Sequence, residues 1–383
     1  MNTHLLRRAI VPTTGVTAGV TAAVGGGAVG VSGYFARQIV TPVVPVDDTP
    51  VLEVGPDHVV FAATEESIAP GRYGLWQNGF TTHLRLGEVL ETEGDRVTRR
   101  VNGVDFGALE VGNARFNGYY FCGPPASSLP IALEETEIAS PLGPAPAWVD
   151  RIPGGDRWAV LVHGRGALRS EALRAVPVLH ELGISSVIPT YRNDLGAPRS
   201  ADHRYHLGLT EWADVEAAVL YAARHGAREV QLFGWSMGGA IVLQLLDRSG
   251  TAELVTKVVL DSPVVDWGPV LDFHAGEHRL PRLVSRVGAS LLRSPLRRAL
   301  AGLAEPVDIR LTDWVGRAEE LTRPMLLIHS AVDEFVPYAP SAALAAARPD
   351  LVQLETWDLA RHCREWNVDP TRWEQSVREF CAD

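Results

Sequence analysis

From Trp158 onward, short apolar runs alternate with stretches of helical periodicity, and this alternation constrains the fold more than any other feature of the chain. The expected strands are Trp158–Val162, Ser186–Pro189, Val230–Phe233, Val258–Leu260, Met325–His329 and Leu351–Glu355. Helices are expected near Glu171–Glu181, Thr210–His225 and Met237–Arg248. The pattern predicts the α/β class, with a doubly wound, mostly parallel sheet covered by helices on both faces. Functional residues in such sheets gather beyond the carboxyl ends of the strands.

A serine motif follows the strand Val230–Phe233. The chain continues Gly234-Trp235-Ser236-Met237-Gly238-Gly239 and then becomes helical, which places G-x-S-x-G between a strand and a helix. The glycines remove Cβ atoms where strand and helix approach each other, and the sharp turn exposes the serine hydroxyl. The new helix directs N–H groups at developing negative charge. We therefore predict Ser236 as a nucleophile and the Met237 amide as an oxyanion donor.

A second loop of interest, His163-Gly164-Arg165-Gly166, follows the strand Trp158–Val162. A glycine-flanked loop at this edge of the sheet can turn the backbone N–H of Arg165 toward the same spot as the Met237 amide. Arg165 is therefore the expected second oxyanion donor. His163 is expected to orient the loop by hydrogen bonds, and its use as a catalytic base is the less favoured alternative.

A serine hydroxyl needs a neighbouring base, which is itself oriented by a carboxylate. Asp333 lies just beyond the strand Met325–His329, and His362 lies in a loop before the last expected helix. The order serine, acid, histidine is the one found in enzymes with a nucleophile elbow. We predict a triad of Ser236, Asp333 and His362.

Three nearby residues compete for these roles. Asp261 and Asp266 follow another strand, but Asp261-Ser262-Pro263 is typical of a turn at a strand end, so Asp333 is preferred. Cys363 adjoins the proposed base. We interpret it as a small apolar residue whose side chain points elsewhere on the loop.

With these motifs, the region from Ile131 to Phe380 resembles a serine hydrolase of the α/β-hydrolase superfamily. The resemblance is carried by four motifs in order: HGRG at 163–166, GWSMGG at 234–239, HSAVDEFVP at 329–337 and ARHCREWN at 360–367. It implies the triad Ser236, Asp333 and His362 and the oxyanion amides of Arg165 and Met237. Ser330 departs from the family, which usually has glycine there. The nearest similar group is that of membrane-anchored or secreted bacterial esterases, related to prolyl-oligopeptidase-type catalytic domains.

The resemblance also divides the catalytic domain, 131–383. Residues 264–323 occupy the position where this superfamily inserts a helical lid. The stretch Leu283–Leu300 is expected to be helical, with Arg286, Arg293, Arg297 and Arg298 on a wet face. A membrane-binding amphipathic helix is the alternative for this stretch. The loop Tyr191–Asp194 is expected to line the rim of the pocket.

Residues 1–37 form a hydrophobic segment in which Arg7 and Arg8 precede an uncharged run, Ala9–Ala36. Its length suits a membrane anchor, and the paired arginines would place the catalytic domain outside the cytoplasm. A cleaved signal peptide, giving a secreted protein, and a glycine-rich cytoplasmic tail are the alternatives.

Residues 38–130 are expected to form a small β-rich accessory region. Strand-like runs occur at His58–Ala63, Tyr73–Gln77, His83–Leu90 and Arg115–Phe121, and turn signals occur at Pro70-Gly71, Asn78-Gly79 and Asn102-Gly103. No cluster of catalytic residue types appears here, so a packing or spacer module is predicted.

Composition narrows the function. The 383 residues include 46 acidic and 35 basic side chains, a formal charge of −11, which argues against a nucleic-acid partner. Three cysteines are too few for a disulfide scaffold, and no metal or organic cofactor is expected. The favoured activity is hydrolysis of a small-molecule or acyl ester. A peptidase, an acyltransferase and a non-catalytic surface protein remain alternatives, and the oligomeric state stays undetermined.

Overall fold

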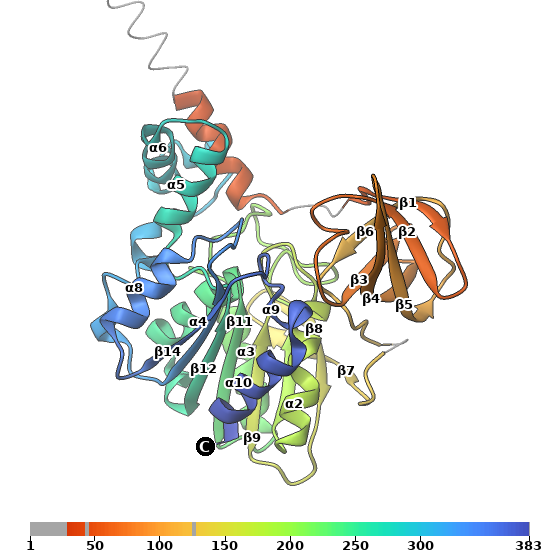
Figure 1. Ribbon diagram of the computed structural model, residues 1–383. Helices are drawn as coiled ribbons and strands as arrows, with labels where there is room; N and C mark the ends of the chain where they lie inside the picture. The colour runs from red at the N-terminus through yellow and green to blue at the C-terminus, as the bar shows by residue number, and fades with distance from the viewer. Residues whose placement is uncertain (1–28, 43–45, 125–127, 383) are drawn as a thin grey trace, which may run out of the picture.

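The computed structural model describes residues 29–42, 46–124 and 128–382, and shows an α/β domain with a β-barrel beside it (Figure 1). The sheet of the α/β domain has the strand order β14-β13-β12-β11-β9-β10-β8-β7. Its strands are β7 (Glu134–Ser140), β8 (Gly143–Asp150), β9 (Arg157–Val162), β10 (Ser185–Pro189), β11 (Glu229–Trp235), β12 (Val255–Asp261), β13 (Met325–Ser330) and β14 (Val352–Trp357). The six strands β9 to β14 pair in parallel, whereas β7 and β8 are antiparallel. The predicted fold class is confirmed.

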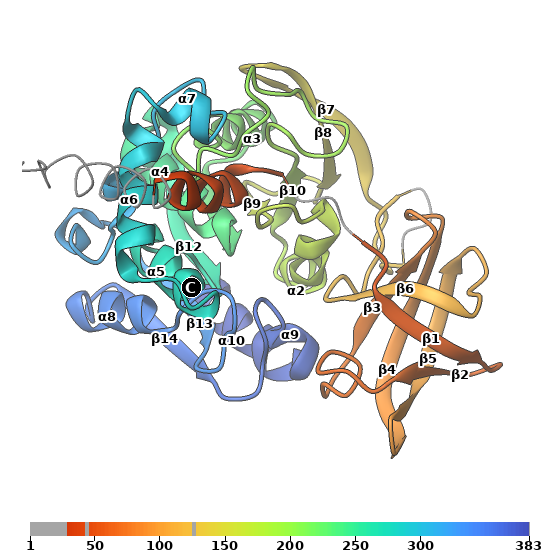
Figure 2. The ribbon, with the colours of Figure 1, turned by 90° about the horizontal axis from the view of Figure 1, so that it is seen from above.

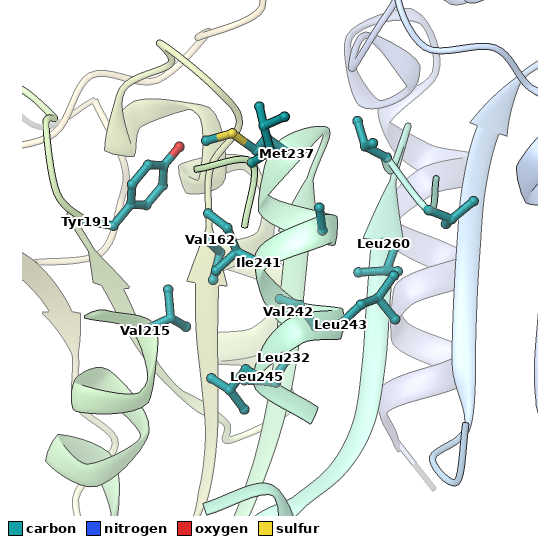
Figure 3. Close-up of a cluster of buried hydrophobic side chains, with 14 of the residues drawn as sticks. Val162, Tyr191, Val215, Leu232, Met237, Ile241, Val242, Leu243, Leu245 and Leu260 are labelled. Atoms are coloured by element: carbon teal, nitrogen blue, oxygen red, sulfur yellow. The ribbon is translucent and has the colours of Figure 1, made fainter. Parts of the chain in front are cut away.

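Helices cover both faces of this sheet. On one face lie α3 (Trp212–Arg224) and α4 (Met237–Arg248), whose apolar side chains join those of β9, β11 and β12 in one core (Figure 3). The other face is covered by η1 (Arg169–Ala175), α2 (Val176–Glu181) and α10 (Pro370–Ala382). The predicted helix Glu171–Glu181 is therefore divided in two. Pro177, which lacks an N–H, lies in the first turn of α2 and suits a helix start there.

The predicted lid lies between β12 and β13. It contains α5 (Trp267–Glu277), α6 (Arg282–Arg293), α7 (Arg297–Leu300) and the short turns η3 (Ile309–Thr312) and η4 (Ala318–Glu320). The continuous helix expected over Leu283–Leu300 is interrupted at Ser294, before Pro295. Arg297 is not on a wet face as expected: it is half-buried, and its guanidinium donates to the carbonyls of Ser294 and Ala304. Arg286, Arg293 and Arg298 are exposed.

The chain is helical over residues 29–40, and this helix lies against α5 and α6 in both ribbon views (Figures 1 and 2). The domain boundary expected at residue 37 therefore falls inside a helix. Most of the expected membrane anchor, Ala9–Ala36, lies outside the described residues. Within the described ranges, no helix has both the length and the apolar content needed to span a bilayer.

The accessory region is a closed six-stranded barrel of order β1-β2-β5-β4-β3-β6. Its strands are β1 (Thr49–Val54), β2 (His58–Ala62), β3 (Tyr73–Gln77), β4 (Thr82–Glu93), β5 (Arg96–Phe106) and β6 (Gly112–Asn117). The expectation of a turn at Asn102-Gly103 is wrong, because both residues lie within β5. Gly103 instead makes room for a neighbour, since a Cβ there would lie 2.4 Å from a guanidinium nitrogen of Arg85. The run Arg115–Phe121 is a strand only as far as Asn117.

The barrel docks beside α9 (Glu365–Val368), a helix that starts three residues after His362. The Arg72 N–H donates to the carbonyl of Asn367 (2.9 Å), and the Asn367 side chain donates back to the Arg72 carbonyl (2.7 Å). The same Asn367 amide also reaches the carbonyl of Gly118 (3.0 Å). Asn367 is fully buried, so these bonds fix the barrel to the segment that carries His362.

Candidate active site

Ser236 lies on a sharp turn between β11 and α4. Its backbone is at φ 52° and ψ −119°, a left-handed conformation that a non-glycine residue adopts only under constraint. The neighbouring glycines supply that constraint by allowing close contact: a Cβ on Gly234 would lie 2.7 Å from the backbone of Gly238, and one on Gly238 would lie 2.1 Å from the Val162 carbonyl. The turn therefore presents the serine hydroxyl at the carboxyl edge of the sheet.

The structure brings the three predicted triad residues together. The Ser236 hydroxyl lies 2.9 Å from Nε2 of His362, and Nδ1 of His362 lies 2.8 Å from Oδ2 of Asp333. These residues follow β11, β14 and β13, three strands that end at the same edge. A Nδ1–H that donates to Asp333 leaves Nε2 free to accept the hydroxyl proton.

The carboxylate of Asp333 is held on all sides. Its Oδ1 accepts the backbone N–H groups of Phe335 and Val336, both at 2.8 Å, and His329 lies 3.3 Å from Oδ2. Burial acts to raise the pKa of Asp333. The charges and hydrogen bonds of His362 and His329 outweigh burial and lower this pKa far below its usual range. Asp333 is therefore a fixed negative charge.

That charge sets the state of the base. Burial acts to lower the pKa of His362, but the Asp333 carboxylate raises it above the ordinary value, with a further contribution from the charge of Glu171. The ring of Phe335 lies against the imidazole, with 5.2 Å between ring centroids. His362 is thus a base of raised proton affinity whose ring is held in place by its neighbours.

The loop after β9 passes close to Ser236. A Cβ on Gly164 would lie 3.1 Å from the Cβ of Ser236, so the loop that continues into Arg165 passes directly beside Ser236. The Gly164 N–H donates to the buried carboxylate of Glu171 (2.7 Å) and is not available as an oxyanion donor. The Arg165 amide has no hydrogen-bond partner among the described residues, and the Met237 amide opens α4. Both predicted donors therefore belong to segments that adjoin Ser236, and their role as oxyanion donors stays a prediction.

His163 is buried behind this loop. Its Nε2 lies 3.0 Å from Asp194, its Nδ1 lies 3.0 Å from the Gly164 carbonyl, and its ring stacks on Tyr191. The Tyr191 hydroxyl also donates to the Gly164 carbonyl (2.6 Å). The expectation that Tyr191–Asp194 lines the pocket rim is wrong for Tyr191, which is fully buried and holds the loop 163–166 through the Gly164 carbonyl.

The competing acids have other partners. Asp261 is buried and accepts the indole N–H of Trp373 (2.8 Å), and Asp266 caps the N-terminus of α5. Burial raises the pKa of Asp261 and raises that of Asp266 to about 6. Neither carboxylate has a recorded contact with His362.

The side chain of Cys363 does not lie where it was expected. Its Sγ does not point away from the base but lies 3.6 Å from Nε2 of His362. Burial raises the pKa of this thiol well above its usual value, with the charges of Glu171 and Asp261 acting in the same direction. A buried thiol of raised pKa is a poor nucleophile, so its interpretation as a small core residue still holds.

Two cavities adjoin the loop after β9, residues 163–166. One, of about 440 Å³, lies between helix 29–40, the lid and the loop after β13, and is lined by Phe35, Ile39, Arg165, Trp267, His274 and Phe335 among others. The other, of about 480 Å³, lies where the barrel meets the α/β domain, with Trp76, Phe106, Trp148, Arg169 and Asp194 in its wall. Both volumes are within the usual range for small-molecule sites.

One group in the barrel has metal-ligand residue types. His83, Asp105 and Cys122 place ligand atoms within 4.8 Å of one another. Both carboxylate oxygens of Asp105 already have partners, Oδ1 in Arg85 (3.0 Å) and Oδ2 in His83 (2.6 Å). The arginine supplies the positive charge that a metal ion would bring, so the group reads as an ion-pair network.

Sequence reasoning missed the residues that hold the loops together. Glu171 fixes Gly164, and the buried Arg174 donates both to the Glu171 carbonyl (2.8 Å) and to the Cys363 carbonyl (2.8 Å), which links the oxyanion loop to the His362 loop. Glutamate and arginine side chains on a predicted helix are usually exposed to solvent, so the sequence pattern did not indicate that Glu171 and Arg174 are buried.

Comparison with known proteins shows the family of the α/β domain. Residues 159–380 match the family described as the alpha/beta hydrolase family, and this match covers more than half of the chain. The chain belongs to the alpha/beta hydrolase family. Residues 50–117, which form most of the barrel, match a domain of unknown function (DUF8805). No curated protein sequence matches the chain.

Several solved structures are similar. The esterase Pf2001 of Pyrococcus furiosus is 17% identical, with 66% of this chain and 90% of that chain covered and a TM-score of 0.51. The esterase EaEST of Exiguobacterium antarcticum is 18% identical, covering 64% of this chain and 99% of that chain, with a TM-score of 0.46. At such identities the likeness to Pf2001 supports the fold alone.

Proposed function

We propose that this protein hydrolyses carboxylic esters through an acyl-enzyme formed on Ser236. The observation that carries the proposal is the continuous chain of hydrogen bonds from Ser236 through His362 to Asp333, with distances of 2.9 and 2.8 Å. Two further observations support it: the loop that carries Arg165 and the start of α4 at Met237 both adjoin Ser236, and an apolar cavity is lined by Phe335, whose ring packs against His362.

The first half of the reaction transfers the acyl group. Oγ of Ser236 attacks the ester carbonyl carbon while Nε2 of His362 takes the hydroxyl proton. The carbonyl oxygen becomes an oxyanion, which the amides of Arg165 and Met237 stabilise. When the bond to the alcohol oxygen breaks, His362 gives its proton to that oxygen, and the acyl group stays on Ser236.

The second half restores the enzyme. A water molecule attacks the acyl carbon and loses a proton to Nε2 of His362. The tetrahedral intermediate collapses, the carboxylic acid leaves, and Oγ of Ser236 regains the proton. Throughout, Asp333 stays ionised and stabilises the imidazolium, in keeping with its strongly lowered pKa.

The test is a comparison of ester and amide substrates with the wild type and Ser236→Ala. We expect wild type to release p-nitrophenol from p-nitrophenyl butyrate and not p-nitroaniline from matched peptide anilides. Ser236→Ala should lose about 10⁴-fold or more in kcat, as removal of a triad member does elsewhere. Faster cleavage of the anilides would favour a peptidase, and ester formation in the presence of added alcohol without net hydrolysis would favour an acyltransferase.

A further inference from the structure

Helix 29–40 presents two different faces to the α/β domain. Ser32, Ala36 and Val40 recur every four residues and are buried to 1% exposure or less. On the adjoining face, a stripe at helical spacing lines the 440 Å³ cavity; it consists of Val31, Tyr34, Phe35, Gln38 and Ile39. The helix is therefore both packed against the domain and open to a cavity.

Close packing holds this helix on the lid. A Cβ on Gly33 would lie 3.1 Å from the side chain of Leu300, and a Cβ on Gly288 of α6 would lie 3.3 Å from the Ser32 carbonyl. Such small residues let the two backbones approach each other. Any larger side chain at Gly288 would push the helix away from α6.

The C-terminal end of the helix is tied to the oxyanion loop. The Val40 carbonyl accepts the N–H of Tyr205 (2.8 Å), and the Tyr205 hydroxyl in turn accepts the N–H of Gly166 (3.2 Å). The Arg165 guanidinium donates to the carbonyls of Ile39 (3.0 Å) and Thr41 (3.2 Å). A positive charge on the last carbonyls of a helix is favourable, and here it comes from the residue whose amide adjoins Ser236.

The opposite wall of the cavity includes Phe335, whose ring packs against His362. Trp267, Val270 and His274 of α5 contribute to this wall together with Phe335. The Phe335 ring lies 4.6 Å from that of His274 and 5.2 Å from that of His362, centroid to centroid. Phe335 thus separates the cavity from His362, with one ring forming part of the wall and packing against the imidazole.

We propose that helix 29–40 is part of the substrate site and forms one wall of the pocket that holds the apolar portion of the ester. The lining is mainly aliphatic and aromatic, and the charge of Arg165 is already taken up by backbone carbonyls, so an uncharged chain suits the cavity. The inference rests on the proposed ester hydrolysis. The chain can be that of the acid or that of the alcohol.

The test uses two tryptophan substitutions in the full-length chain. Val31 and Val29 are both exposed, at 43% and 37%, but only Val31 lines the cavity, so Val29→Trp is the matched control. Activity is measured on p-nitrophenyl esters from acetate to decanoate and on acetates of short and long alcohols. We expect Val31→Trp to lower kcat/KM about tenfold or more for the long members of one of the two series, either the long acyl chains or the long alcohols. Its kcat/KM on p-nitrophenyl acetate should stay within about twofold of wild type. Val29→Trp should match wild type on all of these esters.

A second variant acts from outside the cavity. Gly288→Val should displace the helix from α6. It should lower kcat/KM by a larger factor on the long esters than on acetate, on which the link from the helix to Arg165 also acts, provided that thermal melting shows a folded protein. If Val31→Trp and Gly288→Val both keep the wild-type length profile, or if Val29→Trp changes it as much as Val31→Trp, the inference is wrong. Failure of the proposed function is a different result, because wild type itself would then cleave none of the esters.

Discussion

The guanidinium of Arg165 lies 3.0 Å from the carbonyl oxygen of Ile39, so the residue whose amide we propose as an oxyanion donor also caps the C-terminal end of helix 29–40. The two functions use different atoms of one residue. Displacement of the helix would remove the partners of a half-buried charge, and burial already lowers the pKa of this guanidinium. The position of helix 29–40 and the geometry of the loop 163–166 are therefore coupled.

Substitution of Arg165 tests this coupling. Arg165→Met keeps the backbone amide but removes the link to helix 29–40, and we expect kcat on a short ester to fall about 10- to 100-fold through misplacement of the amide. Arg165→Lys retains a donor and should recover part of the loss. A fall in stability with unchanged kcat would contradict a positioning role.

Glu171 provides a matched pair of variants that separates hydrogen bonding from charge. In Glu171→Gln the side-chain carbonyl can still accept the Gly164 N–H, so the buried hydrogen bond is retained and the loop should keep its geometry. The kcat of this variant should therefore stay within about threefold of wild type. Loss of the negative charge should shift the acid limb of the kcat/KM profile to lower pH, because that charge helps to raise the pKa of His362. Glu171→Leu removes both and should lower kcat. Identical pH profiles for Glu171→Gln and wild type would contradict this electrostatic contribution.

The pH dependence follows from the state of His362. Only neutral imidazole can take the serine proton, so kcat/KM should rise with pH as His362 loses its proton. Asp333 raises that pKa, so the midpoint should lie above about 6.5, the ordinary value for histidine.

Asp333→Asn removes the source of the shift. The midpoint should then move to lower pH, and kcat should fall about 10⁴-fold, because the imidazole loses the carboxylate that fixes its tautomer. An Asp333→Asn enzyme with wild-type kcat would assign the acid role to another residue, and Asp261→Asn is the control for that case.

The parts of the fold that the sequence predicts are those decided by local pattern. The β9 to β14 strands were expected from apolar runs, and the helix Met237–Arg248 has the expected bounds. The hairpin β7–β8 was not expected, because β7 reads EETEIAS and leaves most of its side chains outside the core. Antiparallel strands at an edge can be polar on one face, which hides them from a search for apolar runs.

The same distinction applies to the site. Ser236, Asp333 and His362 could be found because each follows a recognisable strand and the order of the three is known. The pocket wall at helix 29–40 could not be found in this way. Its glycine, serine and valine residues continue the uncharged run that suggests a membrane anchor, and only the contacts with Gly288 and Leu300 show another use.

The barrel should matter for catalysis through Asn367. Asn367→Ala removes two hydrogen bonds from the junction. The Arg72 carbonyl loses the Asn367 amide, and the Gly118 carbonyl keeps only the N–H of Tyr120. We expect a loss of about 2–4 kcal/mol in stability and a lower kcat, because α9 follows the His362 loop directly. The exposed and neighbouring Thr371→Ala serves as a control, and thermal melting with ester kinetics gives both readouts. Unaltered kcat in a destabilised Asn367→Ala protein would restrict the junction to a structural role.

The central claim, that Ser236 is an activated nucleophile, is tested most directly by labelling with a fluorophosphonate and mapping the adduct by mass spectrometry. We predict one adduct on the peptide that carries Ser236 in the wild type, and none in Ser236→Ala. Labelling should also be lost when the wild type is first treated with an ester-like carbamate inhibitor. An unlabelled but folded wild type, or an adduct on Cys363 or another residue, would contradict the account.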